Sequence, residues 1–135
     1  MTEQETTKKV RFKIDGKEVE AEPGTTILEA AQAAAIEIPA LCHYAGLEPY
    51  GACRLCSVEV RRGHRRRVVT SCIYEVADGI EVFTDNERIR KGRKMIMELL
   101  LARAPESEEL KELASRMGVE GTPYPTVTEA QRNCI

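Results

Sequence analysis

The cysteine spacing constrains this chain more than any other feature. Four of its five cysteines lie between residues 42 and 72, in the pattern C-x10-C-x2-C-x15-C. Four thiolates grouped in this way can close around a metal centre, and an odd total of cysteines argues against a closed disulfide framework. The spacing therefore predicts a metal site, with the candidate ligands Cys42, Cys53, Cys56 and Cys72.

Three kinds of centre are compatible with four thiolates, and the spacing separates them. Structural zinc favours two CxxC-like knuckles, whereas only Cys53 and Cys56 form such a pair here. A 4Fe–4S ferredoxin uses a compact run of CxxC steps. A 2Fe–2S ferredoxin combines one CxxC with two outlying cysteines, although its plant-type form has a shorter first gap. The spacing favours a 2Fe–2S cluster and leaves zinc as the alternative.

The composition narrows the class of protein. The N-terminus lacks the apolar stretch of a secretory signal, so we expect a cytoplasmic protein, where cysteines are more often metal ligands than disulfides. No apolar run approaches ~18 residues, so we expect no membrane span. The net charge is −2, and no aromatic residues are interleaved in the basic run 61–67. We therefore expect no nucleic-acid partner.

Residue patterns predict a small domain around the cysteines. Thr26 and Glu29 fit a capping box, which predicts a helix over 27–36 that ends before Pro39. A long loop over 40–55 then carries three of the cysteines. Alternating apolar residues and turn signals predict strands over 10–14, 17–21, 57–61, 67–71 and 80–84. Short strands crossed by one helix indicate an α+β domain of β-grasp type.

Helices are predicted to follow this domain. One runs from its cap at Asn86 to about Arg103, and a second, amphipathic helix runs from Ser107 to Met117. The chain is extended after that and is expected to turn helical at Thr128. The apolar positions of the first helix are Ile89, Met95, Ile96, Leu99 and Leu100.

The segments GTTILEAA, IPALCHYAGLEPYGACRLCSVEV, VVTSC and ELLL together resemble a known family over residues 8–103. It is the N-terminal 2Fe–2S domain of redox subunits, such as the large subunit of bacterial NADH-quinone oxidoreductase, NAD-linked and iron-only hydrogenases and NAD-dependent formate dehydrogenases. The resemblance implies a β-grasp ferredoxin-like domain over 1–84 and a helical extension over 85–135. It also implies a cluster held by Cys42, Cys53, Cys56 and Cys72.

The chain departs from this family directly after the ELLL helix. Many relatives carry a histidine and three cysteines there, which hold a 4Fe–4S cluster. Ala104 stands where the histidine is expected, and no cysteine follows before Cys134. We therefore expect no second cluster of that kind in this segment. Cys134 is either an incidental thiol or the first ligand of a 4Fe–4S motif in a longer chain that is cut here.

Three further features bear on how a cluster would work. Arg54 stands between two candidate ligands and is expected to stabilise the negative charge of a reduced cluster. His43 follows Cys42 and is expected to be structural or a minor tuner of the potential. The basic run 61–67 is either a solvated hairpin tip or a docking patch for an acidic partner surface.

These observations predict a one-electron carrier that belongs to a larger cytoplasmic oxidoreductase linked to NAD(P)H, hydrogen or formate. Its partner would be a protein with flavin or iron–sulfur centres in a hetero-oligomeric complex. The chain has no GxGxxG motif and no nucleophile–base pair, so we expect no substrate turnover by the chain alone. The alternatives are a free-standing ferredoxin and a zinc-stabilised interaction module.

Overall fold

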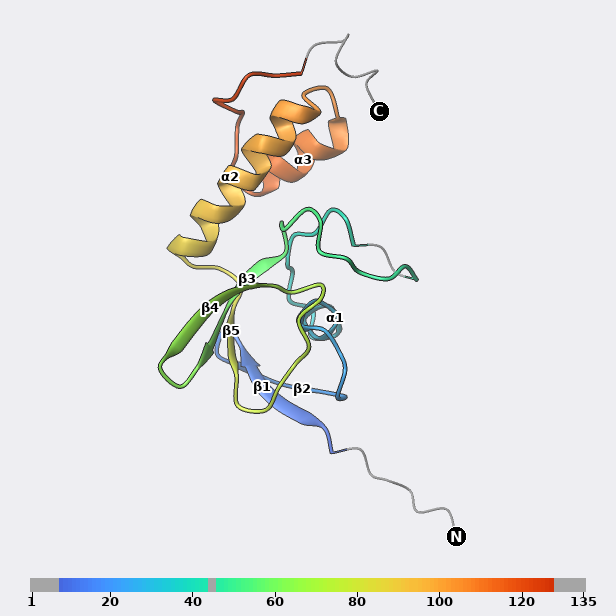
Figure 1. Ribbon diagram of the computed structural model, residues 1–135, viewed down its shortest axis with the longest axis vertical. Coiled ribbons are helices and arrows are strands. Elements are labelled where there is room, and N and C mark those ends of the chain that lie inside the picture. Colours follow the sequence, from blue (N-terminus) through green and yellow to red (C-terminus); the bar gives the residue numbers. More distant parts are fainter. Residues whose placement is uncertain (1–7, 44–45, 128–135) are drawn as a thin grey trace. The chain divides into compact units, whose positions relative to one another are not determined.

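The computed structural model describes residues 8–43 and 46–127 (Figure 1). The chain divides into two compact units, Met1–Ile89 and Arg90–Ile135, and α2 runs from the first into the second. Within the described residues the elements are β1 (Val10–Ile14), β2 (Lys17–Ala21), α1 (Ile27–Ala33), β3 (Ser57–Arg62), β4 (Arg65–Thr70), β5 (Glu81–Phe83), α2 (Glu87–Arg103) and α3 (Glu108–Arg116).

The first unit is built on a mixed sheet with the strand order β2-β1-β5-β3-β4. β1 and β2 form an antiparallel hairpin, whose turn residues Asp15 and Gly16 both have positive φ, as a tight two-residue turn requires. β3 and β4 form a second hairpin. β5 lies between the two hairpins, parallel to β1 and antiparallel to β3. This mixed sheet, together with α1, confirms the predicted α+β fold of β-grasp type.

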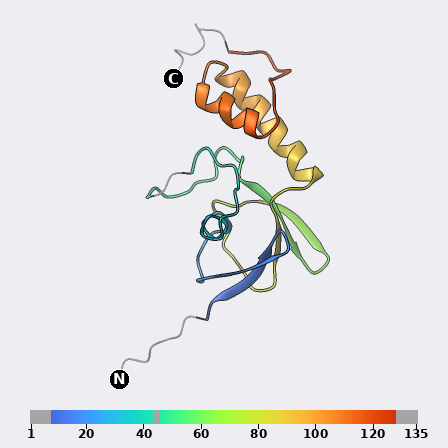
Figure 2. The ribbon, with the colours of Figure 1, turned by 180° about the vertical axis from the view of Figure 1, so that it is seen from behind.

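The hydrophobic core lies between α1 and one face of the sheet. Alternate residues of β1, such as Phe12 and Ile14, are buried while their neighbours are exposed. Figures 1 and 2 show α1 nearly end-on beside the strands. Small residues on this helix let it lie close to the sheet. The residues that meet Phe12 and Ile14 in this core include Ile27, Leu28, Ala31, Val58, Val60 and Val82.

The end of α1 differs from the prediction. The helix was expected over 27–36 but ends at Ala33. Ala35 takes a left-handed conformation with φ 58°, and the next amide, of Ile36, donates to the carbonyl of Ala31 over 2.8 Å. This is the hydrogen-bond pattern of a Schellman motif, in which glycine normally occupies the left-handed position. An alanine there gives no sequence signal for a helix end.

The β3–β4 hairpin is tighter than predicted. Its two strands extend to Arg62 and Arg65, which face each other, so only Gly63 and His64 form the turn. The sequence had indicated that the second strand begins at Arg67. A run of arginines has no alternation of apolar and polar residues, and the strand start was therefore missed.

The buried stripe of α2 also corrects the sequence analysis. Met95 and Leu99, which the sequence analysis names among the apolar positions of this helix, are 56% and 51% exposed. The buried side chains of this helix include Arg93 and Met97, with Ile89 one turn before them. The four-residue spacing of 89, 93 and 97 places these residues on one helix face. Because Arg93 is charged, the pattern of apolar residues does not identify this face as buried.

The second helix of the extension begins and ends as predicted. Ser107 caps α3, because its side chain accepts a hydrogen bond from the Leu110 amide over 3.3 Å. Gly118 follows the helix with φ 75°. None of the helices in the described ranges has the length and apolarity needed to cross a bilayer. The helix expected at Thr128 lies outside the described residues.

Candidate metal centre

The β3–β4 hairpin brings two of the four cysteines together. Cys56 directly precedes β3 and Cys72 follows closely after β4. Ser57 faces Thr70 in the antiparallel register, so both cysteines lie at the open end of the hairpin. Each of these two cysteines is 1% exposed. The sheet itself therefore places one buried thiol pair.

The loop between α1 and β3 brings the other two cysteines together. The amide of Cys53 donates to Sγ of Cys42 over 3.5 Å, and the two side chains share a hydrogen bond. The free thiols of Cys72 and Cys56 share a hydrogen bond, and the negative charge of Cys42 acts on Cys72. All four predicted residues thus form one group of sulfurs arranged as two pairs.

Two pairs of thiols suit a two-iron centre, which takes two sulfurs for each iron. Among residues 8–43 and 46–127, no three His, Cys, Asp or Glu side chains converge at the spacing of a single metal ion. The four cysteines match the donor set of a binuclear cluster in number and in chemistry.

Backbone amides surround Cys53. Burial raises the pKa of its thiol, but hydrogen bonds from the backbone of Leu55, Cys42 and Leu41 outweigh burial and hold the pKa below its usual value. The Leu55 amide donates to Sγ of Cys53 over 3.5 Å. Such amide–sulfur bonds favour the thiolate, which is the form that binds metal.

Cys72 has the opposite electrostatic environment. Burial, the adjacent thiol of Cys56 and the negative charges of Cys56 and Cys42 raise the pKa of Cys72 to about 12, against a backbone hydrogen bond from Gly51. Like charges within a few ångströms disfavour a further charge. A metal that binds at Cys72 must therefore displace a proton, and its own positive charge would remove the cause of the shift.

Gly51 lies at the wall of the site. Its φ is +65°, and a Cβ added to it would lie 3.1 Å from Cδ1 of Ile73. Both the backbone conformation and the close neighbour require glycine at this position. The lack of a side chain lets the Gly51 backbone approach Cys72, which is how backbone groups tune a bound cluster.

A buried ring nitrogen of His43 also fits a site that binds a non-protein group. Its Nδ1 is buried and has no hydrogen-bond partner among the described residues. Buried polar atoms are almost always paired. An unpaired nitrogen one residue from Cys42 therefore fits a site in which the cysteines bind a cofactor.

The segment that carries Cys72 is fixed to its surroundings by bonds that the sequence analysis missed. The hydroxyl of Ser71 donates to the carbonyl of Cys56 over 2.7 Å. The first-turn amides of Ile27 and Leu28 donate to the carbonyls of Tyr74 and Ser71, over 2.9 and 3.1 Å. The start of α1 thus holds this segment in place, with the predicted N-cap at Thr26 confirmed by a bond from the Glu29 amide.

Arg54 occupies an unusual position between the two thiol pairs. It has a left-handed backbone with φ 64°, and its guanidinium donates to Oγ1 of Thr70 over 2.9 Å. Ser57 donates both its hydroxyl and its amide to the Arg54 carbonyl, over 2.6 and 3.2 Å. No feature of the sequence predicted the contact with Thr70.

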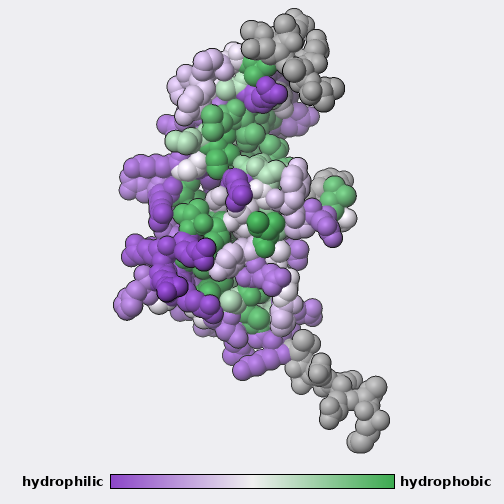
Figure 3. Space-filling model, in the orientation of Figure 1, coloured by the Kyte–Doolittle hydropathy of each residue, from purple (hydrophilic) through white to green (hydrophobic). Residues whose placement is uncertain are grey.

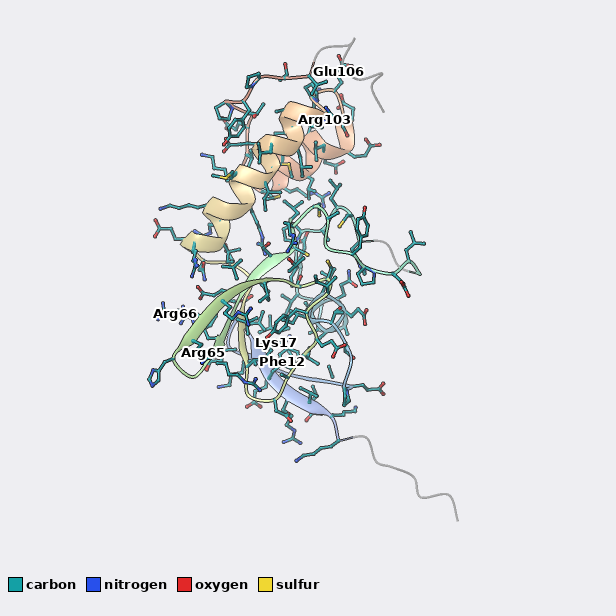
Figure 4. The ribbon with its side chains drawn as sticks, viewed as in Figure 1. Phe12, Lys17, Arg65, Arg66, Arg103 and Glu106 are labelled. Carbon is teal, nitrogen blue, oxygen red and sulfur yellow. The ribbon has the colours of Figure 1, made fainter. Side chains whose placement is uncertain are left out.

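The basic run 61–67 forms the tip of the β3–β4 hairpin. Arg65 and Arg66 project from this tip in Figure 4, and the same region is strongly hydrophilic in Figure 3. Arg61 is an exception, because it bonds to the buried carboxylate of Glu59 over 3.0 Å and lies over the ring of Phe83. The remaining arginines of this tip are exposed.

Comparison with known proteins agrees with this geometry. A family model described as a 2Fe-2S iron-sulfur cluster binding domain matches residues 7–87. The alpha subunit of NADPH-Fe(3+) oxidoreductase from Geobacter sulfurreducens is 43% identical over 96 residues, which are 71% of this chain and 11% of that subunit. The mitochondrial 78 kDa subunit of NADH-ubiquinone oxidoreductase from Candida albicans is 38% identical over 96 residues, 71% of this chain and 13% of that subunit.

A solved structure extends the similarity. The crystal structure of an NAD+-reducing NiFe hydrogenase in the H2-reduced state matches with a TM-score of 0.76 at 30% sequence identity. The match covers 87% of this chain and 52% of that hydrogenase chain. The present chain thus corresponds to a small part of the curated relatives and to about half of the hydrogenase chain.

Proposed function

We propose that this chain, which belongs to the family of 2Fe-2S iron-sulfur cluster binding domains, carries single electrons within a larger cytoplasmic oxidoreductase linked to NAD(P)H, hydrogen or formate. The observation that carries the proposal is the grouping of four thiols into two pairs inside the matched segment. A cluster in this site takes up and releases one electron, and the protein sets its potential and its accessibility.

We assign the cluster ligands as Cys42, Cys53, Cys56 and Cys72. The first pair comes from the loop and the second from the open end of the hairpin. Amides on Cys53 and the backbone of Gly51 beside Cys72 would offset the negative charge that the sulfurs carry. Cys134 lies outside the described residues and has no place in this assignment.

The partner we propose is a protein that carries a flavin or iron–sulfur centre in a hetero-oligomeric complex. The description of the relatives as subunits of oxidoreductases supports this assembly. The cationic hairpin tip supports it as well, because a cluster of exposed arginines suits an anionic surface. We propose residues 1–84 as the electron-carrying domain, with residues 85–135 as an extension.

The test of the function is the anaerobic EPR spectrum of the reduced protein, with iron and sulfide analysis. We expect two irons and two sulfides per chain and a paramagnetic signal that appears on reduction. A colourless protein with zinc in this site would contradict the electron-transfer function. Purification of the full-length native protein without partners would instead favour a free-standing ferredoxin.

The test of the ligands is a set of cysteine-to-serine variants. Replacing Cys42, Cys53, Cys56 or Cys72 should abolish the cluster or change its spectrum, because serine is a poorer ligand for iron–sulfur centres. Cys134→Ser is the control and should leave the iron content at the wild-type value. Loss of the cluster in the control would overturn the assignment.

A further inference from the structure

The inference concerns Arg54 and rests on the proposed function. This residue has a left-handed backbone, which is unfavourable for a side chain other than glycine. Such strain persists only where the surroundings enforce it, and it gathers at functional sites. Two interactions enforce it here: the bonds from Ser57 to the Arg54 carbonyl, and the bond from the guanidinium to Thr70.

The strained backbone has a direct consequence for one thiol pair. It turns the chain so that the amide of Leu55 donates back to Sγ of Cys53. The conformation of Arg54 therefore helps to place an amide donor on this sulfur.

The side chain reaches the other thiol pair. Thr70 is the last residue of β4 and precedes Cys72 by two positions. A guanidinium bonded to Thr70 connects the turn between Cys53 and Cys56 to the strand end that leads to Cys72. It also keeps a permanent positive charge at the end of β4, two residues before Cys72, since arginine does not lose its proton.

We propose that Arg54 is a positioning residue, whose bond to Thr70 holds the two thiol pairs at a fixed separation and holds its charge beside the cluster. Reduction adds one electron and no other group to the cluster. A fixed cation stabilises that added negative charge more than a mobile, hydrated one. Breaking the bond should lower the reduction potential even though the arginine remains.

Thr70→Val tests this proposal, because it removes the acceptor oxygen and keeps the arginine. With dithionite as the reductant, we expect a more negative midpoint potential and altered g-values in the EPR spectrum of the reduced protein. We also expect loss of iron to a chelator to be about tenfold faster. Thr70→Ser keeps the hydroxyl and should restore all three properties.

Arg54→Gln keeps a donor for Thr70 but removes the charge. It should lower the potential, with a smaller effect on iron loss. Arg67→Gln is the matched control, because it removes an exposed arginine of β4, and it should leave the g-values and the rate of iron loss unchanged. Midpoint potential and g-values at the wild-type values in both Thr70→Val and Arg54→Gln would overturn the proposal.

The outcomes separate this proposal from the proposed function. If the wild-type protein gives no 2Fe–2S signal, the function itself is wrong. If the wild-type signal is present and only the thermal stability of the variants falls, Arg54 is merely structural. Unfolding of the apo-protein, followed by circular dichroism, measures that structural part independently.

Discussion

The hydroxyl of the fully buried Ser71 donates a 2.7 Å hydrogen bond to the carbonyl oxygen of Cys56. Ser71 precedes Cys72, so this bond joins Cys56, just before β3, to the residue next to Cys72, just after β4. The Ser71 amide bonds to the same carbonyl over 3.3 Å. The carbonyl thus accepts two bonds from one residue, and the hairpin end is closed around the cysteines.

Removal of this hydroxyl should therefore weaken both the fold and the site. We expect Ser71→Ala to lower the free energy of unfolding of the apo-protein by about 1–2 kcal/mol, because a buried acceptor loses its shorter bond. Denaturant titration measures this change. Ser115→Ala, at an exposed position of α3, should change the value by less than about 0.5 kcal/mol. Equal stabilities for the two variants would contradict the role of Ser71.

A side chain at Gly51 should disturb cluster binding. Gly51→Ala places a β-carbon 3.1 Å from Ile73 and forces alanine into φ +65°. We expect a lower iron content after reconstitution, together with a loss of about 1 kcal/mol in apo-protein stability. Gly46→Ala separates the two effects, because Gly46 also has positive φ but open space around it. Gly46→Ala should lower the stability and retain the cluster.

The thiols of the apo-protein should differ in their reactivity with iodoacetamide. Because the pKa of Cys53 is lowered and that of Cys72 is raised to about 12, Cys53 should begin to react at a lower pH than Cys72. Mass spectrometry of peptides after timed alkylation at several pH values measures both. Equal pH profiles for the two thiols would contradict the described environments.

The same shift predicts a stability change at high pH. The unfolded chain releases the Cys72 proton near pH 8.5, the usual value for cysteine, whereas the folded apo-protein retains it up to about pH 12. The folded state binds more protons in this window, so its stability falls as the pH rises through it. Cys72→Ala should remove this part of the pH dependence, which thermal unfolding at pH 8 and pH 10 would show.

Glu59 should be essential for the junction between β3 and the start of α2. Its carboxylate, 4% exposed, accepts a bond from Asn86 over 3.3 Å and lies 3.0 and 3.8 Å from Arg61 and Arg88. Glu59→Gln places an amide donor among these donors, and we expect a loss of about 1–3 kcal/mol in the free energy of unfolding. The exposed Glu81→Gln is the control and should have little effect.

Ala35 offers a stabilising substitution. Ala35→Gly removes the strain of its left-handed backbone, and we expect a gain of about 0.5–1 kcal/mol in apo-protein stability. Ala33→Gly, two residues earlier and inside α1, should cost about 1 kcal/mol, because glycine is a poor helix former. Denaturant titration of the two variants should give changes of opposite sign in the free energy of unfolding.

The order of the elements was predictable because the local signals agree with the fold. Asp15-Gly16 marks a tight turn and Thr26 marks a helix start, and the structure has both. The end of α1 was not predictable, because Ala35 adopts a conformation for which its side chain gives no signal. The stripe of α2 was hidden by Arg93, a buried residue of a type that is mostly exposed.

The four cysteines lie as two pairs, and their role as cluster ligands stays a prediction. The contacts that support them could not be predicted from the sequence. The pairing of Cys56 with Cys72 depends on the register of β3 and β4, in which Ser57 faces Thr70 and Cys56 bonds to Ser71, the residue before Cys72. The bonds of Ser71 and Arg54 join residues that are far apart in sequence. Local sequence patterns do not predict such contacts.

The register of the β3–β4 hairpin has a consequence for how the centre is assembled. Folding of the sheet alone brings Cys56 and Cys72 together, so the conformational entropy of pairing them is lost before any iron arrives. Cys42 and Cys53 are joined by a loop, whose closure carries its own entropy cost. The sheet would thus hold Cys56 and Cys72 as a pair for a bound cluster, whereas the loop would hold Cys42 and Cys53.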